Sequence, residues 1–174
     1  VDACWTYPSA SAAYEDLRGR MVELLGDYAA VAAQEDFVLA GEAHCGAALD
    51  RSERITSVLD EVADPRVRLH FDIVHLFLAG EGITEAVNTL LPYTAHTHIT
   101  DAIRNTDGSF RLLLLGQGDL DSTEYVRAMK AGGWGDYITL EVSTMVWGRK
   151  DYVPLAAASF SYHVLKGAFA RAGV

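Results

Sequence analysis

The sequence is poor in cysteine and contains no long hydrophobic run. Its two cysteines, Cys4 and Cys45, are too few for a disulfide framework, so we expect a reducing compartment and a cytoplasmic protein. No apolar stretch approaches the roughly 18 residues of a membrane-spanning helix. Residues 1–4 lack the basic start and apolar core of a signal peptide. These absences predict that the chain has no membrane partner.

Positive charge is also scarce. The 174 residues include 14 Lys and Arg against 24 Asp and Glu, a formal net charge of −10. Such a surface repels a phosphate backbone unless a basic cluster overcomes it locally, so nucleic acid is not an expected partner. Half of the residues are hydrophobic and 22% are charged, which is typical of a globular protein. We therefore interpret residues 1–174 as a single domain.

What the sequence does contain is an alternation of strand-like and helix-like segments. Strands are expected at 37–42, 67–72, 95–98 and 137–141. Apolar spacing and capping residues predict helices at 11–34, 50–62, 84–91, 122–131 and 153–172. Residues 99–121 read as a long loop with a turn at 105–108. Strands separated by helices indicate an α/β protein with parallel pairing.

Each of these four strands ends in a potential metal ligand, in the order Glu42, Asp72, His98 and Glu141. The C-terminal ends of parallel strands gather on one face of a sheet or barrel, where active sites are built. Two residues before each ligand stand small or polar side chains, namely Ala40, His70, His96 and Thr139. The alternate positions are mainly apolar. Period-2 geometry therefore directs the four ligand candidates to the same side of the sheet.

Three carboxylates and one imidazole suit Mn²⁺, Mg²⁺, Co²⁺ or Fe²⁺ better than a structural Zn²⁺. Each residue taken alone has an ordinary alternative. Glu42 and Glu141 could be surface acids, Asp72 a helix cap and His98 a buried, hydrogen-bonded histidine. The ordered occurrence of all four favours one divalent-metal site.

These residues also carry a family pattern. The sequence resembles the xylose isomerase-like TIM-barrel superfamily, which includes sugar isomerases, epimerases and dehydratases and is related to endonuclease IV. The matching segments are Gly41-Glu42-Ala43-His44, Asp72-Ile73-Val74-His75, His98-Ile99-Thr100-Asp101, Leu115-Gly116-Gln117-Gly118-Asp119-Leu120-Asp121 and Leu140-Glu141. The resemblance implies a (β/α)8 TIM barrel of which this chain supplies about the last five βα units.

A complete barrel of this kind needs about 250 residues. The first three βα units would be supplied by another polypeptide, removed by cleavage or absent from this sequence. The chain starts at Val1 without a methionine, and its first four residues read as the end of a strand. We therefore expect that it lacks its natural beginning. The missing barrel portion or another subunit is an expected partner.

The resemblance implies a role for each candidate residue. Glu42, Asp72, His98 and Glu141 would bind the metal, with Mn²⁺ the first expectation and Mg²⁺, Co²⁺, Fe²⁺ or Zn²⁺ compatible. Glu42 and Glu141 would also exchange the α-proton of a sugar or keto-sugar on opposite faces, through a metal-stabilised enediolate. His75, placed in a strand-to-loop bend, would polarise a substrate oxygen.

Substrate contacts are expected from residues around this centre, some with a simpler alternative. His44 could contact substrate. Arg104 could bind a substrate hydroxyl or phosphate, or be a solvated loop arginine. Trp5 could stack on a sugar face or pack against the rest of the barrel. His70 and His96 are expected to form hydrogen bonds in the barrel interior. Asp101 could fix the His98 ring or cap the following loop.

The function expected first is therefore a divalent-metal-dependent sugar isomerase or epimerase. Typical ketose 3-epimerases carry a further glutamate shortly after the first ligand, where this sequence has His44-Cys45-Gly46-Ala47-Ala48. This departure leaves room for lyases of the superfamily, namely C-glycoside deglycosidases acting on 3-keto C-glycosides and inosose dehydratases. A non-catalytic barrel subunit is a further alternative. An endonuclease is disfavoured by the charge of −10.

Overall fold

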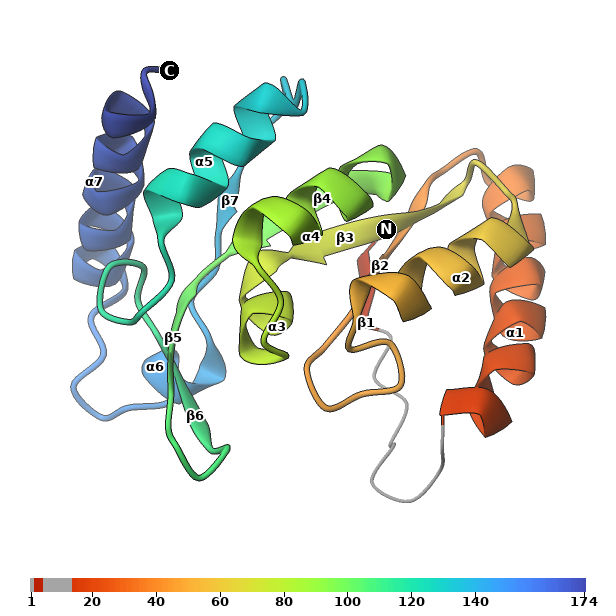
Figure 1. Cartoon of the computed structure of the whole chain (residues 1–174), viewed down its shortest axis with the longest axis horizontal. Coiled ribbons are helices and arrows are strands. Elements are labelled where there is room, and N and C mark those ends of the chain that lie inside the picture. Colours follow the sequence, from red (N-terminus) through yellow and green to blue (C-terminus); the bar gives the residue numbers. More distant parts are fainter. Residues whose placement is uncertain (1, 5–13) are drawn as a thin grey trace.

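The computed structural model describes residues 2–4 and 14–174, which form a parallel β-sheet with helices beside it (Figure 1). The five strands are β1 (Asp2–Cys4), β2 (Leu39–Glu42), β3 (Val67–Asp72), β4 (Thr94–Ile99) and β7 (Thr139–Leu140). Their order is β1-β2-β3-β4-β7, and every neighbouring pair is parallel. The expected α/β arrangement is therefore confirmed, including a strand at the start of the chain. β1 and β7 are the two edges of this sheet.

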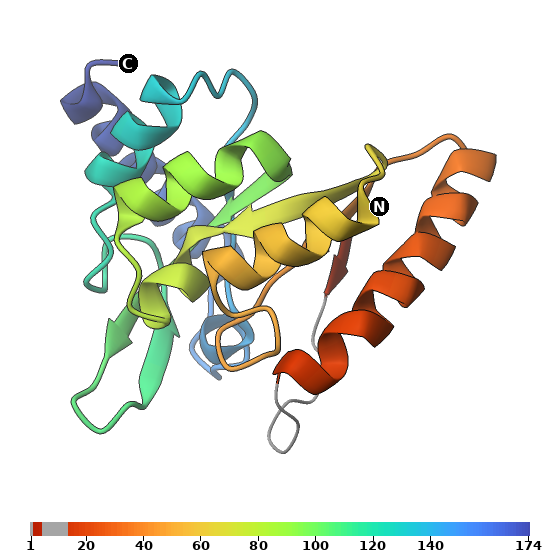
Figure 2. The same ribbon diagram turned by 45° about the vertical axis from the view of Figure 1, so that its right-hand side comes forward.

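Five long helices connect and cover the strands, and each lies close to its expected range. They are α1 (Tyr14–Gln34), α2 (Ser52–Val62), α4 (Ile83–Leu90), α5 (Ser122–Ala131) and α7 (Pro154–Ala172). A short 3₁₀ turn, η1 (Leu91–Tyr93), follows α4. The helices pack on one another in chain order, α1 on α2, α2 on α4, α4 on α5 and α5 on α7 (Figures 1 and 2). None of the described helices is long and apolar enough to cross a membrane.

The alternation of side chains along the strands separates a hydrophobic core from a polar face. Leu69 and Phe71 of β3 and Ile99 of β4 are completely buried and belong to one apolar cluster with the helices. The Phe71 ring meets that of Tyr125 from α5, with 6.2 Å between centroids. Because successive strand side chains point to opposite faces, the intervening histidines and acids lie on the side away from this core.

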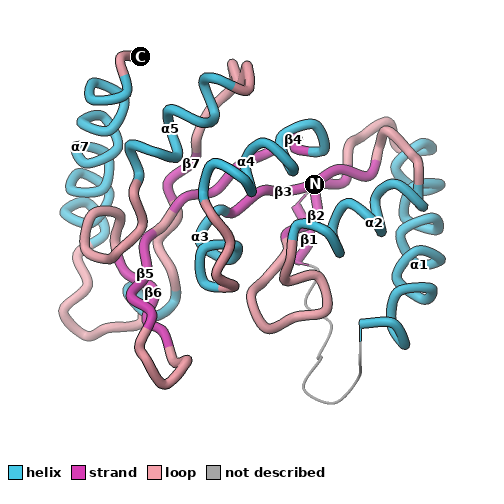
Figure 3. Tube along the Cα trace, in the orientation of Figure 1, coloured by secondary structure: helices cyan, strands magenta, loops and turns pink. Residues whose placement is uncertain are grey.

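Four short elements differ from the expected long loop and bends. Within residues 99–121 the chain forms an antiparallel hairpin of β5 (Asp101–Arg104) and β6 (Phe110–Leu113). Its turn includes Gly108, whose φ of +86° favours glycine. The helices α3 (Ile73–Leu78) and α6 (Thr144–Trp147) follow β3 and β7 directly (Figure 3). Asp72 and Ser143 start them by accepting hydrogen bonds from the amides of Val74 and Met145.

Asp101 fixes the loop between β6 and α5. Its buried carboxylate accepts four backbone N–H groups, from Ala102 at 2.8 Å, Gly116 at 2.8 Å, Gly118 at 3.0 Å and Leu120 at 3.0 Å. A Cβ on Gly118 would lie 2.4 Å from an Asp101 oxygen, so only glycine fits this close approach. Of the two roles expected for Asp101, the structure therefore supports capping of the loop.

We predict that Asp101→Asn lowers the free energy of unfolding by about 3 kcal/mol, because an amide nitrogen would face two of the four N–H donors. Urea denaturation of the purified chain measures this change. Asp107→Asn in the exposed turn of the hairpin is the matched control and should change stability by less than about 0.5 kcal/mol. Equal stability of the Asp101→Asn variant and the unmodified chain would contradict the capping role.

Candidate metal centre

The structure brings together four side chains that lie at or next to the C-terminal ends of the neighbouring sheet strands β2, β3, β4 and β7. One ligand atom from each of Glu42, Asp72, His98 and Glu141 lies within 4.8 Å of the others. Two ligands on opposite sides of one ion, each at about 2.2 Å, are about 4.4 Å apart. The cluster therefore has the dimensions of a single cation site.

Strand register explains why these side chains meet. Asp72 and His98 are direct partners in the ladder between β3 and β4. Glu42 of β2 is paired with His70, which comes two residues before Asp72 in β3. The strand β2 is therefore staggered relative to β3. Glu141 follows the last residue of β7, and its backbone N–H donates to the carbonyl of Ile99 at 3.0 Å. The stagger is of the kind found when a parallel sheet curves into a barrel.

His98 lies between two carboxylates. Its Nδ1 is 3.5 Å from Glu42 Oε1 and 3.7 Å from Glu141 Oε2. This nitrogen and Asp72 Oδ2 are buried, and no hydrogen-bond partner is found for either among the described residues. Buried polar atoms without partners are costly. These two atoms lie beside the carboxylates of Glu42 and Glu141, and a divalent cation is the group that would satisfy them.

The electrostatics of the cluster also favour a cation. Burial and the negative charges of Glu141 and Glu42 raise the pKa of Asp72 well above its ordinary value. Burial likewise opposes ionisation of Glu42, but the imidazoles of His44 and His98 outweigh it and lower the pKa of Glu42. A bound divalent ion would offset the cost of ionising Asp72.

His44 and His75 lie beside this centre. His44 Nε2 is 3.1 Å from Glu42 Oε2, and the His44 and His75 rings are 4.0 Å apart between centroids. His75 Nε2 is 3.8 Å from Asp72 Oδ2. Burial and the neighbouring His44 lower the pKa of His75 to about 3, so the ring is neutral near pH 7. His75 belongs to the first turn of α3, so its expected placement in a strand-to-loop bend is wrong.

Arg104 and Trp5 are the remaining substrate-binding candidates. Arg104 ends β5, is exposed, and its guanidinium lies near Gly80 in the connection between α3 and α4. Trp5 lies outside the described residues. Substrate contacts of Arg104 and Trp5 therefore remain predictions.

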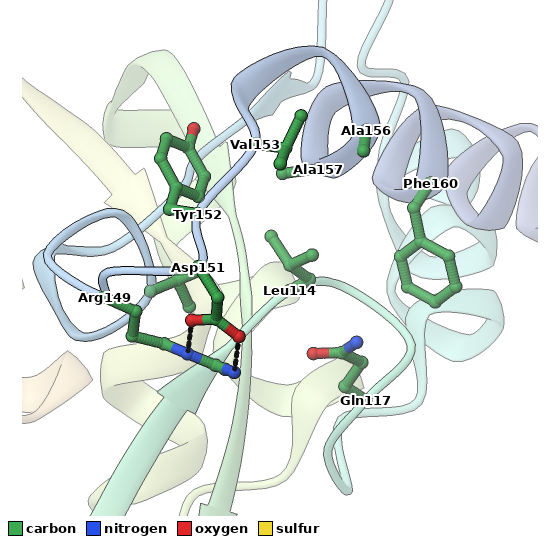
Figure 4. Close-up of a pocket in the computed structure, with 10 residues that line it drawn as sticks. Leu114, Gln117, Arg149, Asp151, Tyr152, Val153, Ala156, Ala157 and Phe160 are labelled. Atoms are coloured by element: carbon green, nitrogen blue, oxygen red, sulfur yellow. Dashed lines mark hydrogen bonds and ion pairs between the residues drawn. The ribbon is translucent and has the colours of Figure 1, made fainter.

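A separate cavity of about 330 Å³ lies among the β6–α5 loop, α6 and the start of α7 (Figure 4). Arg149 and Asp151 line it and form two hydrogen bonds with each other, at 3.2 and 3.0 Å. Leu114, Gln117 and Phe160 also line it. None of the four ligand candidates borders this cavity, so it does not belong to the metal centre.

Comparisons with known proteins place this geometry in context. The family model described as "Xylose isomerase-like TIM barrel" matches residues 4–161. No curated protein matches the chain. Among solved structures, an IolI protein with a bound zinc atom aligns with a TM-score of 0.76 and 20% identity, over 99% of this chain and 62% of that one.

Two further solved structures carry epimerase titles. A D-tagatose 3-epimerase-like protein aligns with a TM-score of 0.78 and 18% identity, over 99% of this chain and 62% of that one. An L-ribulose 3-epimerase aligns with a TM-score of 0.70 and 18% identity, over 91% of this chain and 57% of that one. At these identities the likeness shows the fold, and the chain spans about three fifths of each structure.

Proposed function

Because the chain belongs to the xylose isomerase-like TIM-barrel family, we propose that it carries the metal centre of a sugar isomerase or epimerase. The observation that supports this most is the convergence of Glu42, Asp72, His98 and Glu141 within 4.8 Å. Mn²⁺ is the ion we expect first, with Mg²⁺, Co²⁺, Fe²⁺ and Zn²⁺ as the others that this donor set accepts. A bound divalent ion would supply Lewis-acid stabilisation of negative charge on substrate oxygens.

The protein side chains would perform the proton transfers. Glu42 and Glu141 come from strands that are not neighbours, so they can flank a substrate bound between them. One carboxylate would remove the proton next to the carbonyl of a keto-sugar, and the other would return a proton from the opposite face. Neutral His75 would donate a hydrogen bond to a substrate oxygen, which orients the sugar. Return of the proton to the opposite face gives the epimer.

A lyase outcome is the second candidate, and the position of His44 favours it. The His44 imidazole is 3.1 Å from Glu42, in the segment where typical ketose 3-epimerases carry a further glutamate. A ring held there could protonate a leaving oxygen after the α-proton is removed. Product analysis distinguishes the two outcomes, because elimination yields an unsaturated product and epimerisation does not.

The open strand edges suggest how the barrel is completed. β1 and β7 each pair on one side only within the described sheet, and exposed edges of this kind favour further pairing. We propose that additional βα units, on another polypeptide or on a longer form of this chain, pair with these edges. Intact-mass measurement of every polypeptide in the native material tests this proposal.

Metal analysis tests the centre itself. We expect the purified chain to retain about one Mn²⁺ per molecule after equilibration with Mn²⁺ and removal of excess ion. Glu42→Gln should weaken binding by at least about 100-fold, because the substitution removes a charged ligand. Glu85→Gln, which replaces an exposed acid on α4, should leave binding unchanged. No retention of Mn²⁺ by the unmodified chain would refute the proposed centre.

A further inference from the structure

Three histidines form a second cluster beside the four proposed metal ligands. His96 and His98 occupy alternate positions of β4 and share one face of the strand, and His70 of β3 is the direct ladder partner of His96. The centroid of the His70 ring is 4.0 Å from that of His98 and 4.7 Å from that of His96. The His96 and His98 centroids are 5.4 Å apart. The three rings therefore converge on one region of the polar face.

The spacing of the nitrogen atoms suits a metal ion. One ring nitrogen from each of His70, His96 and His98 lies within 4.8 Å of the others. Nitrogen atoms bound to one tetrahedral ion at about 2.1 Å are about 3.4 Å apart. Rotation of the side chains, moving each nitrogen by about 1 Å, would therefore complete a three-imidazole site. A water or another small ligand would take the fourth position.

This donor set differs in preference from the neighbouring carboxylates. Imidazole suits Zn²⁺ and Cu²⁺, whereas carboxylates suit Mn²⁺ and Mg²⁺. The three-histidine cluster contains no carboxylate, and the affinity of a nitrogen site rises steeply from Mn²⁺ to Cu²⁺. The two clusters are therefore expected to select different ions.

His98 belongs to both clusters, which prevents them from binding metal independently. A neutral imidazole has one nitrogen with a free electron pair, while the other nitrogen carries the proton. His98 Nδ1 faces Glu42 and Glu141, at 3.5 and 3.7 Å. When Nδ1 binds an ion there, Nε2 carries the proton. Binding through Nε2 instead requires the other tautomer and withdraws His98 from the carboxylates.

We propose that His70, His96 and His98 form an alternative metal site for Zn²⁺ or Cu²⁺, and that an ion there excludes Mn²⁺ from the carboxylate centre by taking His98. The existence of this site stands on the three imidazoles alone. Only its competition with Mn²⁺ rests on the function proposed above. The arrangement would make the enzyme sensitive to the balance between nitrogen-preferring and oxygen-preferring ions.

The three-histidine site is tested first in a variant whose carboxylate centre is disabled. In a Glu42→Gln/Glu141→Gln variant the carboxylate centre is disabled, and Cu²⁺ added at one equivalent should show an electron paramagnetic resonance spectrum with coupling to three nitrogens. Adding His96→Phe should reduce the coupling to two nitrogens or release the ion. His163→Phe on the exposed face of α7 is the control and should leave the spectrum unchanged. Failure of the carboxylate-disabled variant to bind Cu²⁺ through nitrogen would overturn the proposal.

Competition is measured in the unmodified chain. The chain is first loaded with one equivalent of Mn²⁺, and Zn²⁺ is then added. The electron paramagnetic resonance signal of free Mn²⁺ measures how much Mn²⁺ is released. We expect about one equivalent of Zn²⁺ to release the Mn²⁺, and at least ten times more Zn²⁺ to be needed in His70→Phe or His96→Phe. Equal release in these variants would mean that Zn²⁺ acts at the carboxylates, which refutes the competition.

The two proposals fail in different ways. If the unmodified chain binds Cu²⁺ through three nitrogens but retains no Mn²⁺, the proposed function fails and the histidine site stands. If it retains Mn²⁺ but the carboxylate-disabled variant binds no Cu²⁺, the histidine site fails and the proposed function stands. The copper spectrum of the unmodified chain tests the histidine site without any substitution in the sheet, so its result does not depend on whether a variant folds.

Discussion

Asp72→Asn is expected to stabilise the metal-free chain while abolishing metal binding. Asp72 is 1% exposed and lies beside Glu141 and Glu42, so its ionised form is costly without a cation. Asparagine keeps the oxygen that accepts the Val74 amide at the start of α3. We expect the free energy of unfolding of the metal-free chain at pH 7 to rise by about 1 to 2 kcal/mol, and the affinity for Mn²⁺ to fall by at least about 100-fold.

Urea denaturation with and without Mn²⁺ measures both effects. The unmodified chain should gain stability with Mn²⁺ concentration as mass action requires, and the Asp72→Asn variant should not. Asp101→Asn is the matched control, because it makes the same chemical change at a buried carboxylate that four N–H groups satisfy. The two substitutions should change stability in opposite directions. Destabilisation of the metal-free chain by Asp72→Asn would contradict this account of the centre.

The same substitution should alter the dependence of stability on pH. Because the pKa of Asp72 is raised in the folded chain, the folded state binds more protons than the unfolded state above the ordinary aspartate pKa of about 3.9. The stability of the metal-free chain therefore falls as pH rises from about 4 through the raised pKa of Asp72. Asp72→Asn should remove this part of the slope.

Glu141→Gln is expected to slow proton exchange next to the carbonyl of a keto-sugar by about 10³-fold at saturating Mn²⁺, because a glutamine cannot accept the proton. Glu141 has the most exposed side chain of the four, with 34% of its area accessible, so it is the carboxylate best placed to meet a substrate. Incorporation of deuterium from D₂O, followed by nuclear magnetic resonance over a panel of ketoses and 3-keto sugars, measures the effect.

The assay uses the native protein together with any polypeptide that purifies with it. Mn²⁺ content is measured for each variant, since Glu141 is also a proposed ligand, and rates are compared only at equal occupancy. Glu85→Gln should exchange protons at the rate of the unmodified protein. If no keto-sugar in the panel exchanges a proton with the native, Mn²⁺-loaded protein, enolisation is the wrong chemistry.

Local sequence patterns predicted the main elements because each depends on near neighbours. The strand ends at or next to Glu42, Asp72, His98 and Glu141 were predicted from short strand-like segments that each run into a potential metal ligand. The helix α3 was missed because residues 73–78 are almost entirely apolar and show no helical periodicity. The hairpin of β5 and β6 was missed because its strands are four residues each, although its turn residues were recognised.

Contacts between residues that are far apart in the sequence could not be predicted from local patterns. Asp101 was assigned two alternative roles, and the choice depended on amides 15 to 19 residues further along the chain. His70 and His96 were expected to make interior hydrogen bonds. Their convergence with His98 follows from a register irregularity between Leu69 and His70, which sets His70 opposite His96.

The sequence by itself determined the alternation of strands and helices, the side of the sheet on which the acids and histidines lie, and the family resemblance. These depend on periodicity and on the order of residue types, which a chain carries before it folds. Tertiary structure decided the stagger that brings Glu42 level with His70, the distances among the ligand atoms, and the sharing of His98 by two clusters. Strand register sets those distances, and register is fixed only when the strands pair and their apolar faces pack against the helices.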